Sequence, residues 1–170
     1  MIIDILLAEF IAVCVFSDIK YRKVYNAITF PVIALGLGLN FINFGLLGLK
    51  ESALGVLAGF ALLILFYLAG GIGAGDVKFM MAVGSLKGYD LAINGGIYGA
   101  VIGGAAAVVI MLFQGRLLNV VKDIAKRLVL FFTFRYRESL IFDSEKTTSL
   151  PYTVFLSAGI VLRVIEIQLF

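Results

Sequence analysis

The sequence predicts an all-α, polytopic membrane protein, and three observations support this fold class. Of its 170 residues, 62% are hydrophobic and only 15% are charged, and the mean hydropathy is +1.08. Apolar runs recur along the whole length, and several approach the roughly 20 residues that a helix needs to cross a bilayer core. Helices satisfy their own backbone hydrogen bonds in lipid. We therefore expect one integral membrane domain over residues 1–170, with about six transmembrane helices.

The first apolar run covers about residues 2–17. It contains Asp4 and Glu9, lacks a basic leader and ends in Ser17-Asp18 instead of a small-residue cleavage site. These features differ from those of a secretory signal peptide. We interpret this run as a retained helix.

Five further runs follow, each bounded by polar residues, at about 27–48, 52–72, 77–86, 91–113 and 150–169. The run at 77–86 is short for a full span, so we expect a partial, tilted or protein-buried helix there. Pro151 is tolerated in the first turn of the last helix. Glycines recur at four-residue spacing at Gly55 and Gly59 and again at Gly95, Gly99 and Gly103. This spacing predicts close helix packing.

Lysines and arginines are unevenly distributed among the connecting segments, and cytoplasmic loops are the ones enriched in them. One set of loops carries Lys20, Arg22, Lys23, Lys78, Arg116, Lys122, Lys126, Arg127, Arg135, Arg137 and Lys146. The opposite loops carry only Lys50 and Lys87. Six passes with both termini outside satisfy every loop. The basic residues are explained by topology, and nothing in the sequence indicates a nucleic-acid partner.

Residues 114–149 form the one long polar stretch, and part of it is amphipathic. A basic amphipathic helix of this kind tends to lie at a membrane interface, where anionic lipid is a reasonable partner. A helix packed on the rest of the protein is the alternative interpretation.

Asp18 and Asp76 each lie at the border of an apolar run, and the six-pass topology places both at the cytoplasmic membrane border. A carboxylate at membrane depth is costly, which makes it a functional-site hypothesis. Each acid also has a structural interpretation. Asp18 could be a solvated interfacial charge or part of an ion pair at the helix end, and Asp76 could cap the following helix.

The residue types present limit the chemistry. The chain has no histidine and a single cysteine, Cys14, which excludes disulfides, a Cys/His zinc site and histidine acid/base catalysis within one chain. No metal or cofactor is expected. Two nearby aspartates can share one proton, so that the charged carboxylate activates a water and the protonated carboxyl supports the developing oxyanion.

The glycine-rich segment before Asp76, at residues 70–75, does not end in Gly-Lys-Ser/Thr and is not a phosphate loop. We expect it to break the helix and to let a substrate backbone approach. In the last run, Arg163 and Glu166 are three residues apart and could form a structural pair. A proton or ion pathway is the alternative.

Three motifs resemble those of the type IV prepilin peptidases, which are Gly-x-Gly-Asp aspartic proteases of the membrane. Gly73-Ala74-Gly75-Asp76-Val77-Lys78 resembles the signature motif of that family. Asp18-Ile19-Lys20-Tyr21-Arg22-Lys23-Val24-Tyr25-Asn26 resembles its first aspartate motif, with Tyr25 where the family usually has proline. Leu150-Pro151-Tyr152 with Ser157-Ala158-Gly159 resembles its last-helix motif.

The resemblance implies a peptidase that removes a short basic leader from prepilin-like proteins at the cytoplasmic face of the inner membrane. Asp18 and Asp76 would be the catalytic pair, while Gly73, Gly75 and Lys78 would shape or orient the site. Because the chain starts at its first helix and lacks paired Cys-x-x-Cys motifs, it resembles the short form without the N-terminal methyltransferase domain. That form serves Flp/Tad-like pili or related secretion and competence systems. An archaeal preflagellin peptidase and a non-enzymatic membrane component or ion-coupled transporter are the alternatives. The oligomeric state is not predicted.

Overall fold

The structure is a computed structural model that describes residues 2–68, 71–113, 115 and 151–169. The described residues form four helices and no strands, which confirms the all-α class: α1 (Ile2–Tyr21), α2 (Asn26–Leu68), α3 (Ala74–Phe113) and α5 (Tyr152–Leu169). Apart from Gly115, the amphipathic segment expected at 114–149 lies outside the described residues.

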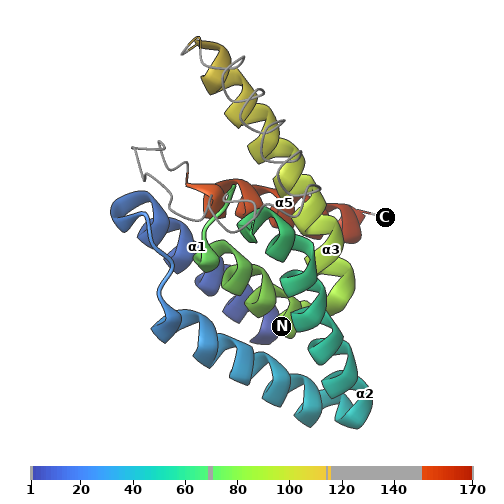
Figure 1. The fold of residues 1–170 in the computed structure, drawn as a ribbon. Helices are drawn as coiled ribbons and strands as arrows, with labels where there is room; N and C mark the ends of the chain where they lie inside the picture. The colour runs from blue at the N-terminus through green and yellow to red at the C-terminus, as the bar shows by residue number, and fades with distance from the viewer. Residues whose placement is uncertain (1, 69–70, 114, 116–150, 170) are drawn as a thin grey trace, which may run out of the picture. The chain divides into compact units, whose positions relative to one another are not determined.

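Two of these helices are interrupted by a glycine. Gly45 in α2 has φ 61° and ψ −145°, and Gly88 in α3 has φ 81° and ψ −175°. Glycine adopts both conformations readily, and both lie outside the range of an α-helix, so each marks a break in the helix. Figure 1 shows that the chain turns back within α2. The two breaks divide the described helices into six helical segments, one for each apolar run of the sequence.

Fewer of the described helices meet the length and hydropathy needed to cross a membrane than there are helical segments. Among the described residues, three helices, α2, α3 and α5, are long and apolar enough to cross a membrane. The six expected transmembrane helices are therefore not confirmed. Large apolar side chains are exposed on all four helices, including Phe16, Ile42, Val101 and Ile165. Such surfaces are compatible with lipid contact, and the protein is a membrane protein.

The first half of α3 is the centre of the core. Phe79, Met80, Ala82 and Val83 have no exposed surface, and the Phe79 ring stacks on Phe10 of α1 with centroids 5.3 Å apart. This is the short run at 77–86, for which a protein-buried helix was one of the expected outcomes. Contacts divide the chain into two units, and the core and site described here lie within the first, which comprises Met1–Gly103 and Pro151–Phe170.

Glycines bring pairs of helices into backbone contact, as their spacing predicts. A Cβ on Gly59 would lie 2.5 Å from the Met80 carbonyl oxygen, and one on Gly99 would lie 2.6 Å from the Leu156 Cα. Both distances are too short for a side chain. The second half of α2 therefore packs on the first half of α3, and the second half of α3 packs on α5.

Candidate functional site

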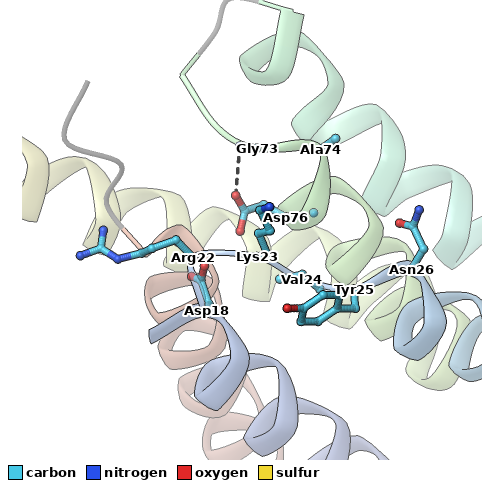
Figure 2. Close-up of a pocket in the computed structure, with 10 residues that line it drawn as sticks. Asp18, Arg22, Lys23, Val24, Tyr25, Asn26, Gly73, Ala74 and Asp76 are labelled. Carbon is cyan, nitrogen blue, oxygen red and sulfur yellow. Dashed lines mark hydrogen bonds between the residues drawn. The ribbon is translucent and has the colours of Figure 1, made fainter. Parts of the chain in front are cut away.

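A pocket of about 380 Å³ brings together the two motif aspartates. Its walls come from the end of α1 and the segment after it, and from the glycine-rich segment and first turn of α3. Figure 2 shows Asp18 and Asp76 reaching it from these different elements. The two acids thus line one pocket, although they are far apart in the sequence.

Both aspartates are largely withdrawn from solvent. Asp18 is 7% exposed and Asp76 is 8% exposed. One oxygen of Asp18, Oδ2, has no hydrogen-bond partner. A buried polar atom without a partner is costly in a folded protein, so this oxygen is available to a water or a substrate group that enters the pocket.

Asp76 serves its own helix as well as the pocket. Helix α3 begins at Ala74, so Asp76 lies three positions after Gly73. Its Oδ2 accepts a hydrogen bond of 3.1 Å from the Gly73 N–H, while its own N–H donates to the Gly73 carbonyl. A carboxylate that reaches back to an amide at the start of its helix is the arrangement of a capping box. The structural role expected for Asp76 is therefore real, but it is not a simple N-cap.

Thr153, in the first turn of α5, joins the two acids. Its hydroxyl donates a hydrogen bond of 2.7 Å to Asp76 Oδ1, and its hydroxyl and backbone N–H lie close to the Asp18 carboxyl group. The residue has no exposed surface. Sequence reasoning missed it, because a single threonine at a helix start is common. The only signal was its place two residues after Pro151.

The segment between α1 and α2 folds over the end of α1. The Ser17 hydroxyl donates to the Lys23 carbonyl at 2.7 Å, and the Arg22 N–H donates to the Asp18 carbonyl at 2.9 Å. Arg22 has φ 53°, a left-handed conformation that is uncommon in residues other than glycine. This sharp turn lets Arg22, Lys23 and Tyr25 line the same pocket as Asp18.

Gly73 and Gly75 both line the pocket, but they face different surroundings. A Cβ on Gly75 would lie 3.0 Å from the Val24 Cβ, whereas one on Gly73 would lie 3.4 Å from Asp76 Oδ2. Gly75 therefore allows the glycine-rich segment to pack on the segment after α1. At Gly73 there is room for a methyl group.

Lys78 is not among the residues that line the pocket. Its ammonium group donates to Asn26 Oδ1 at 2.8 Å and lies 5.7 Å from the centre of the Phe30 ring. Asn26 does line the pocket. Lys78 thus connects α3 to the start of α2 through Asn26.

The other ionisable residues singled out in the sequence lie away from this pocket. Arg163 pairs with Glu166 at 2.8 Å, as their spacing predicts, and also with Asp90 of α3 at 3.0 Å. Tyr98 donates to Glu166 at 3.1 Å. This network connects α3 to α5, which fits the structural interpretation. Within the described part of the chain, no three His, Cys, Asp or Glu side chains come together as metal ligands would.

Comparison with known proteins adds an independent observation. No curated protein and no solved structure matches the chain. The model of the type IV leader peptidase family matches residues 5–115, a region that contains both pocket aspartates and the glycine motif but not α5. Because this match covers more than half of the sequence, the chain belongs to the type IV leader peptidase family and is a protease of the membrane.

Proposed function

We propose that the protein is an aspartic endopeptidase that removes the short basic leader from type IV prepilin-like precursors of the Flp/Tad type, with Asp18 and Asp76 as the catalytic pair. The observation that carries this proposal is the convergence of both carboxyl groups, from separate helices, in one pocket. Family membership supports the reaction. Neither histidine nor a reactive cysteine is needed.

The two carboxyl groups would work as a pair that holds one proton. The ionised carboxylate takes a proton from a water molecule, and the water attacks the scissile peptide carbonyl. The protonated carboxyl donates to the developing oxyanion and then supplies a proton to the leaving amine. The partnerless Asp18 Oδ2 is an open position for that water.

The charge distribution supports a cytoplasmic site in the inner membrane. Lys20 lies in the last turn of α1, and Arg22 and Lys23 follow it at the pocket end of that helix. Positive residues favour the cytoplasmic side. A leader that has not crossed the membrane would meet the pocket there. The apolar helix that follows the leader in a prepilin would remain in the bilayer beside the enzyme.

Substitution of each aspartate tests the proposal. Co-expression of a tagged prepilin with wild type should give a shortened product on a gel. Asp18→Asn and Asp76→Asn should each lower cleavage by about three orders of magnitude or more, because members of a catalytic unit are not replaceable singly. Glu9→Gln, which changes an exposed acid of the same helix as Asp18, is the matched control and should cleave normally.

Two results would contradict the proposal. Wild-type cleavage rates in either asparagine variant would remove that aspartate from the mechanism. Failure of the correctly inserted wild-type protein to cut any prepilin-like precursor would reject the activity itself. Mass spectrometry of the product gives the cleavage position and also shows whether the new N-terminus is methylated; we expect an unmodified amine.

A further inference from the structure

We propose that Thr153 is a positioning residue whose hydroxyl holds the Asp18 and Asp76 carboxyl groups in their one-proton arrangement. This inference rests on the proposed function and adds a third helix to the site. Thr153 lies outside the residues that match the family model, so the match says nothing about it.

The contacts place Thr153 between the two acids. Its hydroxyl is 2.7 Å from Asp76 Oδ1, a distance typical of a strong hydrogen bond to a carboxylate. The same hydroxyl and the adjacent backbone N–H lie close to the Asp18 carboxyl group. Thr153 is fully buried, so its hydroxyl is shielded from bulk solvent.

The position of Thr153 in its helix explains why its backbone is available. Helix α5 begins at Tyr152, and the N–H groups of a first helical turn have no acceptor within the helix. These groups also carry the positive end of the helix dipole, which favours a nearby carboxylate. Asp18 is therefore placed to act as an acceptor for the start of α5.

The side chain of Thr153 is also held in place. Threonine branches at Cβ, which restricts its first side-chain torsion. One turn further along α5, the Ser157 hydroxyl donates to the Thr153 carbonyl at 2.6 Å. The hydroxyl of Thr153 is thus presented to the aspartates from a rigid position.

A hydroxyl suits a pair of acids that share one proton, because it donates one hydrogen and accepts through its lone pairs. Thr153 can donate to the ionised carboxylate while it accepts from the protonated one. When the proton passes from one acid to the other, the hydroxyl can reverse its role. It would thus support the half-protonated pair whichever aspartate carries the proton.

Kinetics of purified protein in lipid nanodiscs, with a synthetic prepilin peptide, test the inference. Thr153→Val keeps the shape and removes the hydroxyl, and it should lower kcat about tenfold or more with little change in KM. The midpoint of the pH–rate profile should also shift in Thr153→Val. Thr153→Ser keeps the hydroxyl and should recover kcat to within about threefold of wild type. Ser85→Ala removes a fully buried hydroxyl that donates to the Ala82 carbonyl and contacts neither acid, and it should retain the wild-type profile.

Wild-type kcat and pH profile in Thr153→Val would overturn the inference. Equal impairment of Thr153→Ser and Thr153→Val would also overturn it, since that result indicates packing instead of hydrogen bonding. If Thr153→Val is not monodisperse on gel filtration, Thr153→Ala is judged by the same criteria.

A second readout does not depend on cleavage. Carbodiimide coupling of an amine to Asp18 and Asp76, followed by peptide mass spectrometry over a pH series, reports the titration of the pair directly. The labelling midpoints should shift in Thr153→Val and return in Thr153→Ser. If wild type cleaves no precursor but the midpoints shift, the proposed function fails while the role of Thr153 stands. Unchanged midpoints reject that role even if wild type is active.

Discussion

At the scale of single residues, Asp76 combines a structural and a chemical position. One of its oxygens accepts from the Gly73 amide and the other from Thr153. Substitution by asparagine keeps the size of the side chain but replaces one acceptor with a donor. Loss of activity in Asp76→Asn should therefore be compared with a measurement of folding, such as the gel-filtration profile, to separate lost chemistry from a lost fold.

The two motif glycines should differ in their sensitivity to substitution. Gly75→Ala puts a methyl group 3.0 Å from the Val24 Cβ, while Gly73→Ala puts one 3.4 Å from Asp76 Oδ2. The first contact is tighter than van der Waals packing normally allows. We expect Gly75→Ala to lower cleavage about tenfold and Gly73→Ala to lower it about threefold or less, measured as initial rates in the prepilin assay.

Equal effects of these two substitutions would contradict the packing explanation. A larger effect of Gly73→Ala would instead indicate that the substrate backbone approaches the chain at that residue. Both variants should be compared at equal amounts of folded protein.

The sequence predicted the acids of the site but not their connection. Asp18 and Asp76 were identified because charge at membrane depth is costly and so has few explanations. Thr153 carries no such signal, since a buried threonine costs little when it is hydrogen-bonded. Ser17 was missed for the same reason. Residues that act through neutral hydrogen bonds become visible only when the partners from other helices are placed.

At the scale of elements, the glycines determine both where helices break and where they meet. The apolar pattern predicted the end of the second run near Gly48, but the break lies at Gly45, and Lys50 and Glu51 belong to the next helical segment. Polar residues near a membrane border can lie within a helix, so hydropathy alone misplaces the turn. The backbone conformation available to glycine decides it.

Two glycines of α2 provide a matched test of helix packing. A Cβ on Gly55 would collide with the backbone of Gly84, whereas none of the described atoms lies within 4 Å of a Cβ on Gly38. Gly55→Ala should destabilise the protein by about 1–3 kcal/mol through overpacking. Gly38→Ala should be neutral or stabilise it by up to about 1 kcal/mol, because alanine favours the helix.

Thermal stability in detergent checks this pair, with the fraction of protein that remains monodisperse after heating as the measure. A Gly55→Ala variant as stable as Gly38→Ala would show that α2 and α3 can separate without loss of the fold.

At the scale of the whole molecule, the six-pass topology makes a prediction about sidedness. Residues 20–25 should face the cytoplasm, and the break at Gly45 should face the opposite side. The single cysteine, Cys14, is fully buried and can be replaced by alanine to give a cysteine-free background. Leu47→Cys, at an exposed position, should then react with a membrane-impermeant maleimide added to intact spheroplasts.

Lys23→Cys in the same background should react only after the membrane is permeabilised. Reaction of both cysteines from the same side would reject the six-pass arrangement. It would not by itself disturb the pocket, because the convergence of Asp18 and Asp76 does not depend on the direction of the membrane.

The site draws on segments that leave the ribosome at very different times. Asp18 is made early, Asp76 follows, and Thr153 arrives only with α5. A nascent chain that has inserted α1, α2 and α3 would hold both acids without the residue that joins them. If Thr153 positions the two carboxyl groups as proposed, proteolytic activity would appear only after α5 has been inserted. The incomplete enzyme would then leave uncut the precursors that are being inserted beside it.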